Sequence, residues 1–318
     1  MKSIQRDIGQ ITYAASQTRT LELPRNFAYR QIELHLDVNI TLVESTAGVV
    51  LDSMPAQFVQ NIQVRANGRD VIKNIDMAGL HRMNQFRRGT RPAITTKANT
   101  AAVATTDYSV SAIIDFEMWR AVKPIDTLFN SAQLATFDLI ITFGDVEACF
   151  GGAFVGVVTV HSGTLYVSAV EAVGVPANTP FLVNKEFTIE KTITAASTNE
   201  QIQLPVSNLF RSFVLKTVSD DCHVNTILNN IQLKSGTEVF VNKRAADIRD
   251  SNKTEFGLET MPDGFYYIEM VKDGRLTESL DTSQLSSLEF VLDVNVPGTT
   301  DKITIYPVEL IQPPPEVK

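Results

Sequence analysis

The stretch Asn61-Ile62-Gln63-Val64-Arg65-Ala66-Asn67-Gly68 decides the fold class of this chain. Polar and apolar residues alternate along its first six positions, which is typical of a β-strand with one buried face. The Asn-Gly pair that follows favours a two-residue hairpin turn, because both turn positions need a positive φ. The strand motif returns as Asn230-Ile231-Gln232-Leu233. It therefore predicts a β-protein built from a repeated unit.

Five further pairs of segments match between the two halves of the chain, in the same order. The offset between matched residues only falls along the chain, from 181 to 138, so the first half has the longer loops. This order predicts an internal duplication. The matched pairs are Ala14–Ser16 with Ala195–Ser197, Leu21–Pro24 with Ile202–Pro205, Phe116–Met118 with Ile268–Met270, Leu134–Phe143 with Leu285–Val294, and Leu165–Glu171 with Ile303–Glu309.

Segments rich in β-branched and aromatic residues recur through both halves, as strands prefer. Helical patterns are few and short, and lie at 76–88, at 245–253 and around Leu134 and Leu285. We expect strands at 31–38, 62–66, 110–118, 137–143, 164–171, 186–194, 211–218, 239–242, 265–271, 288–296 and 302–311.

An uncharged segment rich in Pro and Gly, 172–180, separates the two halves as a linker does. We expect a first barrel over residues 1–174, with longer loops, and a second barrel over 175–318 that ends in a Pro-rich tail. Each half then has the size and the strand number of a jelly roll. The predicted fold class is all-β, with two tandem jelly-roll barrels from an internal duplication and few short helices.

The composition excludes a general nucleic-acid-binding protein. The 318 residues carry a formal net charge of −8, with 44% hydrophobic and 20% charged residues. Phosphate binding needs a basic surface, whereas this balance keeps a concentrated protein soluble. The N-terminus lacks the apolar core of a signal peptide, and the most apolar segment, 150–160, is too short to span a bilayer. We expect a soluble protein of a reducing cytoplasm, with Cys149 and Cys222 as buried free thiols.

The sequence contains none of the common catalytic or metal-binding motifs, and its four histidines are scattered. Two alternatives stay open. The tetrad Asp220-Asp221-Cys222-His223 could join a metal site if further ligands came from elsewhere. The strand acids Asp115, Glu117 and Glu269 could act as paired carboxylates in a glycosidase. Because Glu117 and Glu269 hold equivalent repeat positions, a structural role is favoured, and we predict no catalytic, cofactor or metal site.

The opening Leu21-Glu22-Leu23-Pro24 and the strand–turn block Asn61–Arg69 carry a resemblance to a known family. They are similar to parts of the double jelly-roll major capsid proteins of tailless icosahedral phages that enclose a membrane, the corticovirus-like and finnlakevirus-like phages. In that family an apolar-x-Leu-Pro opening precedes a strand and a strand–Asp-Gly–strand hairpin, whereas the turn here is Asn-Gly. The resemblance covers most of the chain as architecture. It implies a capsomer that is a trimer of double barrels with a pseudo-sixfold outline.

The function expected from this resemblance is structural, that of a major capsid protein in an icosahedral virion, assembled in the host cytoplasm as a homotrimeric, pseudo-hexameric capsomer. Its expected partners are other copies of itself, penton and minor capsid proteins, and an internal lipid membrane. No cofactor and no recognition of a specific nucleic-acid sequence are expected. A carbohydrate- or receptor-binding tandem β-sandwich and a tandem jelly-roll hydrolase remain as alternatives.

One segment departs from the acidic character of the chain. No Asp or Glu occurs between residues 77 and 106, although the segment carries five basic residues, Arg82, Arg87, Arg88, Arg91 and Lys97. We expect these side chains to face anionic lipid headgroups, nucleic acid or the acidic groups of a neighbouring subunit. A solvated helix end and loop is the simpler alternative. On the first hypothesis, reversing the charges of Arg87 and Arg88 leaves the monomer folded and impairs assembly.

Two further segments are expected to act in contacts between subunits. The Ala- and Thr-rich stretch Thr95–Thr106 has too little apolar bulk to order by itself, so we expect it to order against a neighbour. The run Gln312–Glu316 contains three consecutive prolines and cannot continue a strand ladder, because proline lacks the N–H donor. We expect it to form an extended arm on the surface.

Overall fold

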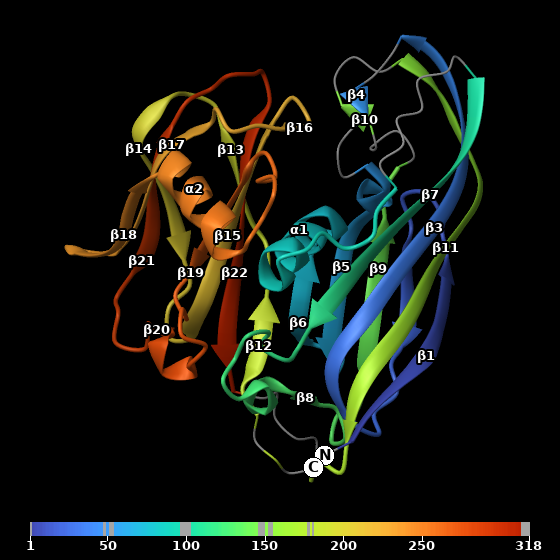
Figure 1. Cartoon of the computed structure of the whole chain (residues 1–318), viewed down its shortest axis with the longest axis horizontal. Coiled ribbons are helices and arrows are strands. Elements are labelled where there is room, and N and C mark those ends of the chain that lie inside the picture. The colour runs from blue at the N-terminus through green and yellow to red at the C-terminus, as the bar shows by residue number, and fades with distance from the viewer. Residues whose placement is uncertain are drawn as a thin grey trace.

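A computed structural model describes residues 2–46, 49–50, 54–95, 103–145, 150–151, 155–176, 179 and 181–312. Two barrels stand side by side with a helix between them (Figure 1). The described part of the chain is mostly β-strand and holds two α-helices, α1 (Met77–Arg88) and α2 (Ala245–Glu255). The prediction of an all-β protein with two tandem jelly rolls and few short helices is confirmed.

The first barrel is made of two facing sheets. One has the strand order β1-β11-β3-β7, with β8 paired to β3, and the other contains β6-β5-β9-β2. A small two-stranded sheet joins β4 to β10. The bounds of these strands are β1 (Lys2–Thr12), β2 (Thr18–Glu22), β3 (Ala28–Thr46), β4 (Val49–Val50), β5 (Val59–Ala66), β6 (Asp70–Ile75), β7 (Val103–Asp115), β8 (Phe129–Asn130), β9 (Phe137–Phe143), β10 (Phe150–Gly151) and β11 (Val155–Val173).

The second barrel repeats this arrangement with shorter loops. One sheet has the order β14-β21-β17-β18, and the facing sheet pairs β15 and β13 with β22 and pairs β19, β20 and β16 with β15. The bounds are β12 (Val183–Glu186), β13 (Ile189–Ile193), β14 (Ser197–Leu204), β15 (Leu209–Ser219), β16 (Cys222–His223), β17 (Leu228–Ser235), β18 (Glu238–Arg244), β19 (Phe265–Glu269), β20 (Leu280–Asp281), β21 (Leu288–Val294) and β22 (Asp301–Ile311).

The duplication predicted from the sequence holds at the level of strand register. In both barrels the ladder shifts at the same step, where a buried Glu of the last strand lies opposite an aromatic residue. These pairs are Tyr29 with Glu171 and Phe210 with Glu309. The two aromatic residues lie 181 residues apart and the two glutamates 138 residues apart, and these are the offsets of the corresponding sequence matches. A shared irregularity of this kind is a conserved design of the unit, because a bulge re-aims every side chain beyond it.

Local sequence accounts for the turns and helices. Asn67 and Gly68 both have positive φ, 52° and 72°, as the predicted hairpin turn between β5 and β6 requires. The helices expected at 76–88 and 245–253 are present. The helical expectation around Leu134 and Leu285 was wrong, because each run forms only a turn in which the leucine N–H donates to the carbonyl three residues earlier. Such short runs cannot offset the cost of starting a helix.

Each helix is attached to its own barrel by one buried asparagine. The Asn84 amide accepts a hydrogen bond from the Ile113 N–H at 2.7 Å and donates to the Ile113 carbonyl at 2.8 Å. The Asn252 amide makes the same two bonds to the peptide groups of Tyr267, at 2.9 and 2.8 Å. The two helices are therefore equivalent parts of the duplicated unit.

Candidate functional site: the seam between the two barrels

A continuous sheet joins the barrels. Strand β6 of the first barrel pairs in parallel with β12 at Lys73 and Glu186, and β12 pairs with β22 of the second barrel. The hydrophobic core of the first barrel also extends across the boundary and includes the second-barrel residues Val214, Tyr267 and Tyr306. The two barrels thus share both backbone hydrogen bonds and apolar contacts.

Helix α1 fills the seam (Figure 1), and its residues 77–87 are all buried. Its N-cap residue, Asp76, accepts a hydrogen bond from the Gly79 N–H at 3.1 Å, which satisfies an end group of the helix. Asp76 also accepts from the Lys216 ammonium at 3.0 Å and from the Tyr306 hydroxyl, both in the second barrel. Burial acts to raise the pKa of Asp76, but Lys216 and Tyr306 hold it below its ordinary value.

The close approach of helix and sheet requires glycine at position 79. A Cβ atom there would lie 2.6 Å from the ring and hydroxyl of Tyr306 and 2.8 Å from Asp76. Real Cβ atoms do not approach so closely, so a larger residue at this position would require either α1 or the Tyr306 side chain to move. At the other end, Phe86 of α1 packs against Phe256 and Tyr267 of the second barrel, with ring centroids 5.7 and 5.3 Å apart.

A cluster of buried charges closes the C-terminal end of the seam. The Arg87 guanidinium donates to the Glu186 carboxylate at 2.5 Å, and the Lys73 ammonium lies 3.4 Å from the same carboxylate. All three side chains are fully buried. Burial acts to raise the pKa of Glu186, yet Arg87 and Lys73 keep it below its ordinary value. Burial lowers the pKa of Lys73 to about 8.

Asp115, at the end of β7, completes this cluster. Its carboxylate accepts from Arg88 at 2.6 Å and lies 3.7 Å from Arg87, while its carbonyl accepts from Lys73 at 2.8 Å. Burial raises the pKa of the Asp115 carboxyl, and Arg87 and Arg88 oppose this effect. The cluster joins three cations to two carboxylates that come from β7 and β12. Breaking one partner of such a group strands a buried charge, which costs about 3–5 kcal/mol.

Most of the five basic residues predicted to meet lipid, nucleic acid or a neighbouring subunit are engaged within the chain instead. Arg82 and Arg87 are 3% and 2% exposed, so they lie inside the chain and cannot meet a membrane or nucleic acid. Arg88 is bonded to Asp115 and stacks over the Trp119 ring at 4.5 Å. Arg91 is partly buried and donates to His81 at 3.3 Å. Lys97 lies outside the described residues.

The structure also corrects the expected effect of charge reversal at Arg87. An acidic side chain there would face Glu186 in the closed seam, where both side chains are fully buried and the two like charges would repel each other. Reversal is therefore expected to destabilise the folded chain rather than assembly alone. Lys73 and Glu186 were not identified from the sequence, although Glu186 lies within a predicted strand and Lys73 lies in β6, the strand that follows the Asn-Gly turn.

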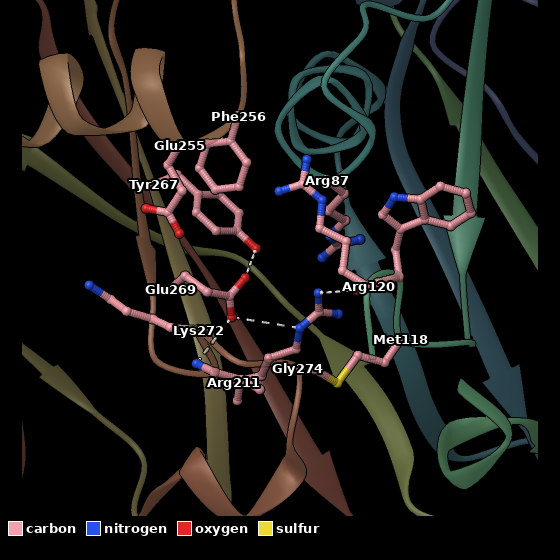
Figure 2. A pocket seen from close by; sticks show the side chains of 12 residues that line it. Arg87, Met118, Arg120, Arg211, Glu255, Phe256, Tyr267, Glu269, Lys272 and Gly274 are labelled. Carbon is pink, nitrogen blue, oxygen red and sulfur yellow. Dashed lines mark hydrogen bonds and ion pairs between the residues drawn. The ribbon is translucent and has the colours of Figure 1, made fainter. Parts of the chain in front are cut away.

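A small cavity of about 40 Å³ lies beside this cluster (Figure 2). The side chains of Arg87 and Arg120 reach toward it from one barrel, and Arg211, Tyr267 and Glu269 line it from the other. Burial raises the pKa of Tyr267 to about 12 and raises that of Glu269. The volume admits a few ordered waters, which suits the buried Nη1 atom of Arg211, for which no hydrogen-bond partner is found among the described residues.

The paired-carboxylate alternative is not supported by the geometry. Glu117 forms a two-pronged ion pair with Arg30 in the first barrel. Its repeat equivalent, Glu269, lies 3.8 Å from Arg211, the equivalent of Arg30, in the second. Each acid is therefore held by the arginine of its own barrel, as the symmetry of the duplication predicts. Asp115, the third acid of that alternative, is bound by the seam arginines.

The remaining candidates are the two cysteines and the tetrad Asp220–His223. Cys222 is partly exposed, so the expectation of a buried thiol was wrong for it, and Cys149 lies outside the described residues. Asp220 accepts hydrogen bonds from Thr299 and Thr300 and thereby closes a loop. No group of three or more His, Cys, Asp or Glu residues that could hold a metal ion occurs in the described ranges. Among the same residues, neither helix has the length and apolar character needed to cross a membrane.

Solved structures share this arrangement over nearly the whole chain. The STIV MCP, from Sulfolobus Turreted Icosahedral Virus, is similar with a TM-score of 0.79 and 15% identity, over 98% of both chains. The major capsid protein P2 of bacteriophage PM2 is similar with a TM-score of 0.66 and 14% identity, over 97% of this chain and 98% of that one. The chain has the fold of these viral capsid proteins. The similarity thus extends over both barrels.

More distant capsid structures agree. A PBCV-1 virus capsid chain is similar with a TM-score of 0.63 and 9% identity, over 98% of this chain and 95% of that one. No protein-family model and no curated protein sequence matches the chain. The capsid fold is therefore visible in the architecture and not in the overall sequence. This is why the internal repeat and the hairpin motif carried the prediction.

Proposed function

We propose that the chain is the major capsid protein of an icosahedral virus, and that three copies form a capsomer of six barrels. The observation that carries this proposal is the shared capsid fold, which extends over 97–98% of this chain and of the PM2 and STIV proteins. Two jelly rolls fixed by a buried seam supply a rigid tile of two similar lobes. Three such tiles, related by closed cyclic symmetry, make a nearly hexagonal unit that can pave flat facets.

The finer parts of the proposal concern partners. We infer that the chain lies in the virion capsid, assembles in the host cytoplasm, and meets penton and minor capsid proteins and an internal membrane. Contact of the basic segment with lipid or genome now depends on Arg91 and Lys97, because Arg82, Arg87 and Arg88 are engaged within the chain. The division into barrels at residues 1–174 and 175–318 is part of the same proposal.

Mass photometry of the purified protein tests the assembly directly. We expect a species of three 35.1 kDa chains that resists dilution, and electron microscopy of that species is expected to show a hexagonal outline. An obligate interface of this kind buries on the order of 2,000 Å² or more. A stable monomer at micromolar concentration that forms no larger particle at any salt concentration would contradict the capsid proposal. That result would favour a carbohydrate- or receptor-binding module.

A further inference from the structure

The seam within the chain has a simple form. The helix of the first barrel lies against the outer face of two paired strands of the second, β15 and β22. We call the outer face of these strands, and of their equivalents β3 and β11 in the first barrel, the docking face of each barrel. On the docking face of the second barrel, Lys216 and Tyr306 receive the N-cap residue Asp76.

The second barrel carries the same helix in an uncovered state. Helix α2 starts 168 residues after α1 and buries only Ala245, Ile248 and Asn252, which face its own barrel. Its N-cap residue, Arg244, is the equivalent of Asp76 and makes no capping hydrogen bond. The Arg244 side chain is 75% exposed. The outward side of α2 is therefore exposed to solvent, whereas the equivalent side of α1 is buried in the seam.

The first barrel carries an uncovered docking face. By strand register, His35 and Ser168 are the equivalents of Lys216 and Tyr306. Ser168 donates to Glu33 at 3.2 Å, and His35 lies 3.0 Å from Asp37. Glu33, His35 and Asp37 alternate with buried core residues of β3, and Ser168 lies between two buried residues of β11, so these side chains point away from the barrel. The docking face of the first barrel is thus acidic where that of the second is basic.

The charges of the open helix and the open face are the reverse of those in the closed seam. Within the chain, an acidic N-cap meets a lysine. On the open surfaces the N-cap is Arg244, whose exposed guanidinium pairs with Asp247 of its own helix at 2.7 Å. The open face carries two carboxylates, Glu33 and Asp37. The far end of the helix is reversed as well, because Glu255 takes the place of Arg87. At the N-cap end the charges differ on both sides of the contact, and this is the pattern that electrostatic complementarity requires.

We propose that α2 of one copy docks on the β3–β11 face of a second copy, with Arg244 opposite Glu33 and Asp37. The inference rests on the proposed function and names the surface by which copies meet. It also explains how the order of barrels is fixed. Asp76 and Lys216 are already bonded to each other within the chain, so α1 and the β15–β22 face are not open to another copy. In the described part of the chain α2 and the β3–β11 face remain open, so a contact of this kind joins the second barrel of one copy to the first barrel of another.

A charge swap tests this pairing. Dilution series by mass photometry at one salt concentration would compare the wild type with Arg244→Glu, Glu33→Lys and the double variant. Each single change is expected to raise the concentration at which half of the trimer dissociates by about tenfold or more. The double variant is expected to return to within about threefold of the wild type. Arg69→Glu is the matched control, since the Arg69 side chain is 74% exposed on the β5–β6 turn and is expected to change nothing.

The outcomes separate the two proposals. A wild-type trimer that is unaffected by Arg244→Glu, or a double variant that is as weak as the single ones, overturns the docking inference and leaves the capsid proposal intact. A wild type that stays monomeric overturns the capsid proposal and this inference with it. Circular dichroism of each variant establishes that the barrels are folded, which is expected because all of the substituted side chains reach solvent.

Discussion

Helices α1 and α2 occupy equivalent places in the two barrels of the duplicated chain, yet one is buried and the other is exposed on its outward side. Each is held to its own barrel by a buried asparagine, Asn84 or Asn252, and each is followed by a glycine with positive φ, Gly89 or Gly257. Residues 77–87 of α1 are all buried, whereas α2 buries three residues. The difference arises because a second barrel covers α1, whereas no other element in the described part of the chain covers the outward side of α2.

The comparison shows which residues belong to the unit and which belong to its neighbours. The asparagine contact toward the helix's own barrel is the same in both copies. Residues on the other side have diverged at both ends of the helix, from Asp76 to Arg244 and from Arg87 to Glu255. The contact with the helix's own barrel is determined by the geometry of that barrel. The residues on the opposite side of the helix are determined by the surface that the helix faces. Substitutions in the two sets are therefore expected to act differently.

The largest effect is expected from removing the carboxylate that joins α1 to the second barrel. Glu186→Ala leaves Arg87 and Lys73 buried beside each other without a counter-charge. We expect the free energy of unfolding to fall by about 3–5 kcal/mol, measured by urea denaturation at a fixed protein concentration. Burial and the loss of Glu186 both act to favour the neutral form of Lys73, so the loss should be smaller above pH 8 than at pH 7.

Glu190→Ala is the control for this prediction. Glu190 lies four residues further along, is 52% exposed and pairs with Lys302 at 3.5 Å. Because exposed ion pairs contribute little, its removal is expected to change the unfolding free energy by no more than about 0.5 kcal/mol. If the two variants were equally stable, the buried cluster would not be what holds α1 in the seam.

This cluster also marks the limit of what the sequence could predict. The strands were predictable because alternation along Asn61–Ala66 is local, and the duplication was predictable because its matches keep their order. The fate of the basic segment was not, because the acid that neutralises Arg87 lies 99 residues away in Glu186. A run without nearby acids in the sequence is not a basic surface when a distant strand supplies the carboxylate.

The helix equivalence was within reach of the sequence but was not recognised. Asn84 and Asn252 stand at the same distance from the starts of their helices, and their offset of 168 continues the 169 of the preceding strands. Asparagine disfavours the interior of a helix, so its recurrence at one helical position indicates a specific hydrogen-bonding role. The sequence did not indicate that α1 would be covered on both sides, because the second side is covered by the distant second barrel.

An intermediate effect is expected at the two asparagines, where the helices are alike. Asn84→Ala and Asn252→Ala each leave a buried strand N–H and carbonyl without their amide partner. We expect a loss of about 2–3 kcal/mol in each case, and the two losses should agree within about 1 kcal/mol. Urea denaturation of the two variants measures both. A much smaller loss at Asn252 would mean that α2 is not anchored in the way α1 is.

The smallest effect concerns a pH dependence that only α1 should have. His81 of α1 and Arg249 of α2 are equivalent, and they donate to the equivalent carbonyls of Ser111 and Phe265. Burial, together with the nearby Arg91, lowers the pKa of His81 to about 4 from an ordinary value of 6.5. Between these values the unfolded chain binds a proton that the folded chain does not, so this contribution to stability falls as the pH drops from 6.5 to 4.

His81→Asn keeps a donor near the Ser111 carbonyl and removes the titrating ring. Between pH 6 and pH 5 the wild type is expected to lose about 1 kcal/mol more stability than this variant, since one pKa unit corresponds to 1.36 kcal/mol. Thermal unfolding across this pH range would measure the difference. Arg249→Gln changes the equivalent residue of α2, which does not titrate near this pH, and should keep the wild-type slope. If both variants had the wild-type slope, the acid sensitivity would arise outside α1, and the covered helix would differ from the open one in packing and charge pairing alone.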